Sequence, residues 1–339
     1  MPSTTTTHKL AIFGAGLVGR QHVARVAAHP QLELAAIIDP AMAGQAIELE
    51  TGGSTIIDAA LNDPSAIDGA IIATPNDTHK DLAIWLIEAG VPVLIEKPIA
   101  GRLDHAEVII AAAKAHKTPV LVGHHRRHSA ILQRAKAIID AGQLGDIVSV
   151  QASFVLAKPK SYFAADWRRE PGAGPVFINL VHDIDCLRFL CGDIIDVRAM
   201  RANVGRGFAV EDRAAAILRF ASGALGTLIG TDMAASPWSW ELTAGENPAY
   251  FQRYQDCYQI AGTRGALGLP SMRFWYHEGE PDWHAPIYSR GEALVESDPL
   301  VCQLDHFIDV IAGAASPIID AEDAARTLQI AHAIASGHL

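Results

Sequence analysis

A lysine that directly follows a very apolar stretch is the first candidate for proton transfer. Residues 91–95, Val-Pro-Val-Leu-Ile, predict a buried strand, and Glu96-Lys97-Pro98 follows without a break. A lysine shifts its pKa readily on partial burial, which suits it to take up or release a proton. The alternative is a surface lysine paired with Glu96, which is less expected at the end of a buried strand. We therefore predict that Lys97 is catalytic, and an X-Pro bond also allows a cis peptide before Pro98.

A histidine in the middle of the chain is the second candidate. Residues 178–190 predict a helix that follows a glycine-rich run, and Asn179, His182 and Asp183 share one of its faces because they are spaced i, i+3, i+4. Asp185 lies three residues beyond the histidine. An imidazole beside an amide and carboxylates suits proton transfer and substrate anchoring. The alternative is an ordinary core histidine, but the glycine-rich entry and the neighbouring acids favour a function.

Proton transfer at an alcohol also requires an acceptor for hydride, which no side chain can be. Residues 9–19 read Lys-Leu-Ala-Ile-Phe-Gly-Ala-Gly-Leu-Val-Gly, an apolar run followed by G-x-G-x-x-G and a helix-forming stretch. In a dinucleotide-binding βαβ unit the first glycine allows the tight turn, the second allows a pyrophosphate to approach, and the third allows close helix packing. The helix N-terminus then faces the pyrophosphate. The predicted cofactor residues here are Gly14, Ala15, Gly16, Leu17, Val18 and Gly19.

An aspartate at the end of the second predicted strand specifies the dinucleotide. Residues 32–39 read as a buried parallel strand, and Asp39 lies 20 residues after Gly19, where a carboxylate binds the adenosine ribose. A capping aspartate before Pro40 is the alternative. The carboxylate would repel a 2′-phosphate, and residues 40–42 contain no arginine to hold one. We therefore predict NAD rather than NADP.

Two more strands end in polar residues at the same predicted edge, where doubly wound sheets bind ligands. The strand 70–73 runs into Thr74-Pro75-Asn76, and the amides and hydroxyls there could contact a ribose or nicotinamide or cap the helix 79–89. The strand 118–122 runs into residues 124–128, which could bind a polar or anionic substrate or form an exposed basic loop. From these turns we predict cofactor contacts at Thr74, Pro75, Asn76, His79, Glu96 and Lys97, and substrate contacts at His125 and Arg127.

Composition limits the class of protein. The chain has 339 residues, half of them hydrophobic, which is enough for two domains with large cores. Its net charge of −11 argues against non-specific binding to nucleic acid or anionic membranes. We see no transmembrane segment, no signal sequence and no metal-binding pattern, and the four cysteines lack C-x-x-C spacing. We expect a cytoplasmic protein with reduced thiols.

The hydrophobic pattern changes near residue 146 and so predicts two domains. We expect a Rossmann domain over residues 1–123 and an α+β domain over 124–339 with an open, mostly antiparallel sheet. The first would add helices at 20–29, 42–51 and 103–116 and a strand at 54–57. The second would begin with the helix 129–141, and its strands are predicted at 147–154, 194–203, 211–220, 223–231, 256–262 and 271–276.

These motifs together resemble the Gfo/Idh/MocA oxidoreductase family. The matching stretches are GAGLVG at 14–19, ATPNDTH at 73–79, EKP at 96–98, Trp167-Arg168 before PGAGP, HDID at 182–185 and the helical tail 304–335. The resemblance implies that the last helices pack back on the first domain, and that Lys97 and His182 work at the reacting carbinol. Family members often have Asp four residues before the histidine, where this chain has Ile178. The proton must then be carried without that aspartate.

We expect NAD-dependent oxidation of a secondary alcohol on a sugar, cyclitol or sugar acid. A cyclic hydroxy acid or dihydrodiol is an alternative substrate. An NAD-dependent glycosidase or lyase without net redox change and a non-catalytic NAD sensor are alternative functions, because fold alone does not decide. We expect a homodimer or homotetramer, since an open apolar sheet face would otherwise aggregate. The predicted substrate contacts also include Trp167, Arg168, Asn179, Asp183 and Asp185.

Overall fold

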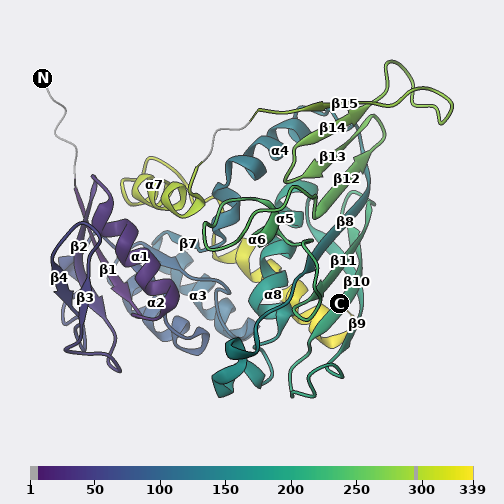
Figure 1. Ribbon diagram of the computed structural model, residues 1–339. Coiled ribbons are helices and arrows are strands. Elements are labelled where there is room, and N and C mark those ends of the chain that lie inside the picture. Colours follow the sequence, from purple (N-terminus) through teal and green to yellow (C-terminus); the bar gives the residue numbers. More distant parts are fainter. Residues whose placement is uncertain (1–6, 294–296, 339) are drawn as a thin grey trace, which may run out of the picture. The chain divides into compact units, whose positions relative to one another are not determined.

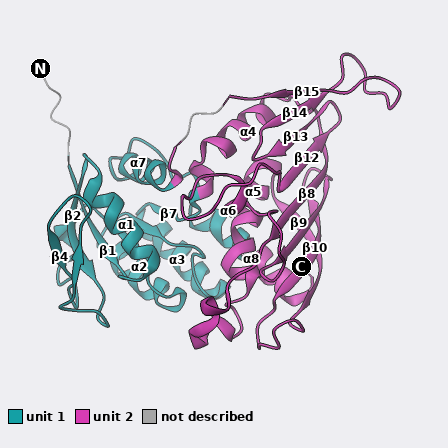
Figure 2. Cartoon of the chain, viewed as in Figure 1, with its two compact units in different colours: residues 1–125, 300–328 teal, residues 126–299, 329–339 magenta. Residues whose placement is uncertain are grey.

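The chain forms two compact units, each built around its own sheet (Figures 1 and 2). The computed structural model describes residues 7–293 and 297–338. Unit 1 comprises residues 1–125 and 300–328, and unit 2 comprises residues 126–299 and 329–339. The predicted boundary was residue 123, and the chain passes from unit 1 to unit 2 after His125. The segment 300–328 returns to unit 1.

Unit 1 is a Rossmann-like parallel sheet with the strand order β2-β1-β5-β6-β7. Strands β5, β6 and β7 are apolar and buried throughout, as expected for a sheet covered on both faces. Helix α1 packs on β1 and β2, and α2 packs on β5 and β6. The bounds are β1 His8–Phe13, α1 Leu17–Ala28, β2 Leu32–Ile38, β5 Gly69–Ile72, α2 His79–Glu88, β6 Val93–Ile95, α3 Leu103–His116, β7 Val120–Val122 and α7 Pro299–Ile311.

The predicted helix over residues 42–51 is wrong. This segment forms β3 (Ala46–Glu48), which pairs antiparallel with β4 (Ser54–Ile56). Three glycines in and beside the segment, Gly44, Gly52 and Gly53, have φ angles of +82°, +95° and +85°. These angles lie in the left-handed region, so the backbone turns instead of continuing a helix despite helix-favouring neighbours. The strand 54–57 was predicted correctly as β4.

Unit 2 contains an eight-stranded sheet with the order β15-β14-β13-β12-β8-β11-β10-β9. All of its neighbouring strands are antiparallel except β8 and β11, so the predicted open, mostly antiparallel sheet is confirmed. Helix α5 packs on β8 and α4. The bounds are α4 Ala130–Asp140, β8 Ile147–Val155, α5 Val181–Cys191, β9 Ile194–Ala202, β10 Arg213–Phe220, β11 Leu225–Thr231, α6 Trp240–Thr243, β12 Tyr258–Gly262, β13 Gly265–Leu269, β14 Arg273–Tyr276 and β15 Tyr288–Gly291. Helix α8 (Ala321–Ser336) begins in unit 1 and ends in unit 2.

Two strands of this sheet, β13 and β15, were not predicted from the sequence, each for its own reason. Strand β13 carries Gly265 and Gly268, and glycine weakens a strand. Both glycines are required by close contacts, because a Cβ at Gly265 would lie 3.0 Å from the Trp275 carbonyl oxygen and one at Gly268 would lie 2.3 Å from Asp256 Oδ2. Strand β15 is exposed along its whole length, so no hydrophobic pattern marks it.

The segment that carries His182 differs from a plain helix. Residues Val176–Leu180 form a turn of π-helix that leads directly into α5. The wider π turn changes the angular spacing of the residues before the histidine, and such turns are frequent at functional sites. Asn179 therefore does not keep the i, i+3 relation to His182 that a regular helix would give. No described helix is long and apolar enough to cross a lipid bilayer.

Candidate functional site

The glycine turn in unit 1 has the geometry that a phosphate needs. Gly14 has a φ of +98°, and a Cβ there would lie 2.4 Å from the Ala73 carbonyl oxygen. A Cβ on Gly19 would lie 1.9 Å from the Gly14 carbonyl oxygen, so both positions require glycine for the fold itself. Around Gly16, by contrast, no atom lies within 4 Å of such a Cβ. The space beside Gly16 is open in front of helix α1, whose N-terminus has no side-chain cap.

Asp39 stands beside this turn and is bonded to it. Its Oδ2 accepts a hydrogen bond from the Ala15 N–H at 2.9 Å, and its Oδ1 accepts one from the Ala41 N–H at 3.1 Å. A carboxylate offers about four acceptor positions, so two of them are left for hydroxyl groups. The capping role that the sequence allowed is therefore real, and it leaves room for the predicted contact with a ribose. The turn and the aspartate together fit a dinucleotide.

The buried side chain of His79 supports the turn after β5. Thr78 donates its hydroxyl to Thr74 Oγ1 at 2.7 Å, and Asn76 begins a short 3₁₀ turn before α2. His79 is fully buried, with Nε2 2.9 Å from the Thr74 carbonyl oxygen and Nδ1 3.2 Å from that of Pro98. Burial lowers the pKa of His79, although the Thr74 carbonyl opposes the shift. We infer that His79 positions the turn and the Lys97–Pro98 segment.

Lys97 lies at the carboxyl end of β6 with a buried carboxylate beside it. The Lys97–Pro98 peptide bond is cis, as the sequence allowed. Glu96 is buried, accepts the Lys97 N–H at 3.2 Å and contacts His22 Nε2 at 2.7 Å. Burial alone would raise the pKa of Glu96, but the hydrogen bond and charge of His22, together with Lys97 and His125, hold it below its usual value. His22 was not predicted, because only the fold brings helix α1 to the end of β6.

Two arginines at the start of unit 2 pair with the acids around His182. Arg127 donates from Nε and Nη2 to the two oxygens of Asp185 at 2.8 and 2.7 Å. Arg126 donates to Asp183 Oδ1 at 2.9 Å. Each of these four residues is less than a tenth exposed. Arg127, Asp183 and Asp185 were predicted to bind substrate; the structure gives them one another or Arg126 as partners, and we infer that they position α5.

The network around Asp183 contains residues that the sequence did not single out. Asp183 also accepts a hydrogen bond from the hydroxyl of Tyr258, and Arg126 donates to Glu241 at 2.6 Å. Burial raises the pKa of the Asp183 carboxyl above its usual value even beside Arg126. The partners lie 57 to 132 residues apart in the chain, so no local pattern announces them. The one feature of the sequence that pointed to this network is the pair of adjacent arginines, Arg126 and Arg127, after the predicted strand 118–122.

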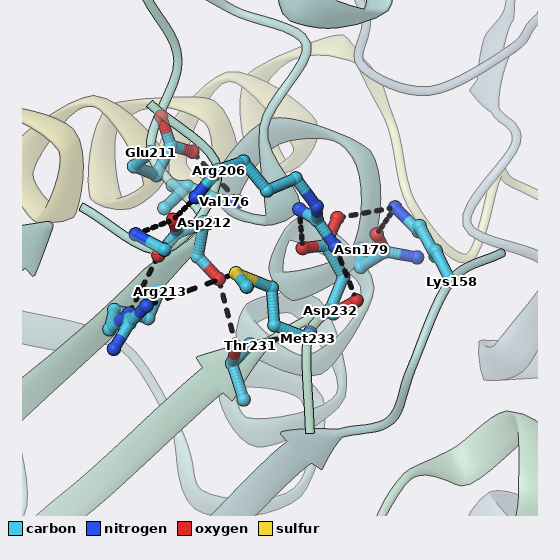
Figure 3. Close-up of polar contacts among 11 residues, drawn as sticks. Lys158, Val176, Asn179, Arg206, Glu211, Asp212, Arg213, Thr231, Asp232 and Met233 are labelled. Carbon is cyan, nitrogen blue, oxygen red and sulfur yellow. Dashed lines mark hydrogen bonds and ion pairs between the residues drawn. The ribbon is translucent and has the colours of Figure 1, made fainter. Parts of the chain in front are cut away.

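The remaining predicted substrate and catalytic residues differ in exposure. His182 lies at the start of α5 and is 8% exposed. Asn179 accepts a hydrogen bond from the ammonium of Lys158 at 2.7 Å, as Figure 3 shows. Trp167 is 56% exposed. Arg168 lies over the rings of Trp167 and Tyr162 and donates to the Tyr162 carbonyl oxygen at 2.7 Å. His125, the last residue of unit 1, is half-buried in a 3₁₀ turn.

Comparison with known proteins identifies relatives of both units. Residues 8–124 match the family model described as an oxidoreductase family with an NAD-binding Rossmann fold, and residues 132–268 match the GFO/IDH/MocA C-terminal domain. The rhizopine catabolism protein MocA of Rhizobium meliloti is 32% identical over 196 residues, which is 55% of this chain. The chain thus spans 58% of the length of that relative.

Two further matches extend over nearly the whole chain. The scyllo-inositol 2-dehydrogenase (NAD(+)) of Bacillus subtilis is 26% identical, with 95% of this chain and 91% of that protein covered. The crystal structure of the WlbA dehydrogenase from Bordetella pertussis, in complex with NADH and UDP-GlcNAcA, superposes with a TM-score of 0.73. Its sequence is 22% identical, with 98% of this chain and 96% of that chain covered, so it supports the fold. Matched in both units by its models, the chain belongs to the GFO/IDH/MocA family of oxidoreductases.

Proposed function

We propose that the protein is an NAD-dependent dehydrogenase that oxidises a secondary alcohol of a sugar, cyclitol or sugar acid. One observation carries the proposal: the glycine turn and Lys97 follow β1 and β6, which flank β5 in one parallel sheet. Their carboxyl ends therefore form one edge, and a dinucleotide bound at the turn would have a titratable lysine near its path. The Bacillus subtilis relative, named as a scyllo-inositol dehydrogenase that uses NAD(+), supports a polyol substrate.

The residues of unit 1 fit NAD in chemistry and shape. Gly16 leaves open space for a pyrophosphate before the N-terminus of α1, and Asp39 keeps two acceptor positions for ribose hydroxyls. The negative charge of Asp39 would repel the 2′-phosphate of NADP. When bound, NAD supplies the nicotinamide that accepts hydride. The chain's own residues have to bind the substrate and remove the hydroxyl proton.

Lys97 is the proposed proton acceptor, and Glu96 with His22 would position it. The carboxylate of Glu96 accepts the backbone N–H of Lys97, which holds the end of β6 in place. His182 in unit 2 is the second candidate acceptor. It lies in the first turn of α5, which the buried pairs Arg126–Asp183 and Arg127–Asp185 connect to the segment before α4. With Ile178 in place of the aspartate often found in this family, the proton passes to Lys97 or His182 without a carboxylate relay from that position.

The test measures turnover and cofactor binding separately. The purified protein would be screened with NAD against polyols, aldoses and hydroxy acids, with NADH followed by absorbance. Lys97→Ala should abolish turnover while NADH binding, measured by fluorescence, persists. His182→Ala serves as the parallel variant, and the larger loss of kcat identifies the proton acceptor. Full turnover by Lys97→Ala would refute the assignment, and substrate conversion without net NADH would replace the dehydrogenase with a lyase or glycosidase.

A further inference from the structure

A cluster of cations in unit 2 lies next to the helix that carries His182. The Lys158 cluster, shown in Figure 3, consists of Lys158, Asn179, Arg206 and Asp232. The Lys158 ammonium donates to Asn179 Oδ1 at 2.7 Å and lies 3.3 Å from Asp232 Oδ2. Arg206 pairs with the same carboxylate and donates to the Asp232 carbonyl oxygen at 2.7 Å. A single buried carboxylate, 1% exposed, thus balances two cations.

A third cation lies on the ring next to Lys158. The Lys158 Nζ is 4.6 Å from the centroid of the Tyr162 ring, and the Arg168 Cζ is 4.0 Å from the same centroid. An aromatic ring attracts cations to its face, so Tyr162 can hold both side chains in place. Arg168 has no carboxylate partner among the residues that the structure describes.

The cluster therefore carries more positive than negative charge, and it has donors left over. An ammonium has three N–H donors, and Asn179 and Asp232 account for two of those of Lys158. The Nε of Arg168 is buried and has no hydrogen-bond partner in the described part of the chain. Buried donors are nearly always satisfied in folded proteins. Glu241, whose charge also acts on Lys158, is paired with Arg126. Arg126 is shared between Glu241 and Asp183, and the unused donors of Lys158 and Arg168 suit an anionic group.

We propose that Lys158 and Arg168 bind a carboxylate of the substrate, so that the enzyme acts on a polyhydroxy acid in preference to a neutral sugar or cyclitol. The inference rests on the dehydrogenase function proposed above and narrows its substrate class. Asn179 accepts from Lys158 and lies in the π turn that leads directly into α5, the helix that carries His182. The planar guanidinium of Arg168 matches a carboxylate through parallel N–H bonds, and Lys158 contributes a point charge.

Burial of Lys158 should make the KM for an acidic substrate depend on pH. It lowers the pKa of the Lys158 ammonium below that of a free lysine, although the charge of Asp232 opposes the shift. Lys158 therefore loses its proton at a lower pH than an exposed lysine does. The KM for an acidic substrate should rise on the alkaline side as that proton is lost, whereas the KM for a neutral substrate should stay flat. Lys158→Arg, which keeps the charge, should remove the rise.

The experiment compares a hexose, the corresponding hexuronate and the hexose 6-phosphate with NAD and the full chain. Lys158→Met and Arg168→Met should each lower kcat/KM for the hexuronate by about 10- to 100-fold, mainly through KM, because each removes one charge-assisted bond. The hexose value should change by less than about twofold. Arg169→Met is the matched control, since Arg169 pairs with the exposed Asp166 in the same turn. It should leave all three substrates unaffected.

A second measurement separates this inference from the dehydrogenase proposal. Calorimetric titration of hexuronate into the protein with NADH present needs no turnover, and binding that Lys158→Met and Arg168→Met weaken would support the subsite even if no alcohol is oxidised. Arg168→Met leaves the Lys158–Asp232–Arg206 contacts intact, so it reports on binding if Lys158→Met fails to fold. Equal losses for hexose and hexuronate would overturn the inference, as would tighter binding of the hexose phosphate or wild-type preference for the hexose.

Discussion

Replacing Asp39 tests most directly how unit 1 would choose its cofactor. The carboxylate makes two bonds to the backbone N–H groups of Ala15 and Ala41, at 2.9 and 3.1 Å. That leaves about two acceptor positions for the ribose hydroxyls. A hydrogen bond to a charged group contributes about 1.5 to 3 kcal/mol, and 1.4 kcal/mol corresponds to a tenfold change in Kd. Losing one such bond should raise the Kd for NADH by about 10- to 150-fold, so Asp39→Ala should raise it by at least about 10-fold.

The same substitution should change selectivity and stability in predictable directions. Without the carboxylate the 2′-phosphate of NADPH is no longer repelled, so the Kd for NADPH should rise less than that for NADH, or fall. The Ala15 N–H loses its acceptor in a fully buried residue, so the variant should also unfold more easily, by about 1 to 3 kcal/mol. Asp39→Asn retains an acceptor for that N–H and should recover stability without recovering NADH affinity in full.

Fluorescence titration of NADH and NADPH at fixed ionic strength measures both affinities. Asp68→Ala is the matched control, because Asp68 also accepts a backbone N–H, that of Lys9 at 2.8 Å, but precedes β5 at the opposite edge of the sheet. It should leave both Kd values unchanged. Two results would refute the reasoning: a folded Asp39→Ala protein that binds NADH as tightly as the wild type, or a wild type that binds NADPH as tightly as NADH.

Two further predictions concern stability and assembly. The pKa of Glu96 is held below its usual value of 4.5, so ionised Glu96 stabilises the fold above that pH, and this stabilisation is lost as the pH falls through the lowered folded-state pKa. Urea unfolding of the wild type and Glu96→Gln should show a stability difference that shrinks in acid; a difference independent of pH would contradict it. Met200, Ile217 and Ile229 are 82%, 60% and 51% exposed on one face of neighbouring strands. We propose that this face joins subunits, so light scattering should find an oligomer, and Ile217→Glu with Ile229→Glu should give a monomer; a monomeric wild type would contradict the proposal.

The parts of the fold that sequence reasoning predicted are those where a local constraint determines the residue. Gly14 and Gly19 must be glycine because a Cβ would overlap backbone atoms, and such positions appear as a motif within a few residues. The buried strands of unit 1 are short and uniformly apolar, and so they stand out. The helix prediction for residues 42–51 was wrong because the local residue propensities favour a helix. Gly44 and the glycines that follow the segment impose turns, which residue propensities alone do not reveal.

The polar contacts could not be predicted for a different reason. His22 and Glu96 are 74 residues apart, and Lys158 and Asn179 are 21 apart, with no spacing rule that links them. Sequence reasoning marks a carboxylate near a histidine as a possible substrate ligand, but it cannot see whether an arginine from another segment already occupies it. Asp183 and Asp185 illustrate this, since both were predicted to contact substrate and both pair with arginines.

That pairing changes which part of unit 2 has to recognise the substrate. Because the Arg126–Asp183 and Arg127–Asp185 pairs are buried, breaking either one would leave an uncompensated buried charge at a cost of about 3 to 5 kcal/mol. A few hydroxyl contacts from a substrate would not supply that energy, so these acids would keep their arginines in a complex. Asp183 Oδ2, which has no hydrogen-bond partner in the described chain, could still accept a hydroxyl, whereas an anionic group of a substrate needs unused donors. Lys158 and Arg168 have unused donors. Substitutions in this unit should therefore first change the selectivity for charged over neutral substrates, rather than the selectivity for a pattern of hydroxyls alone.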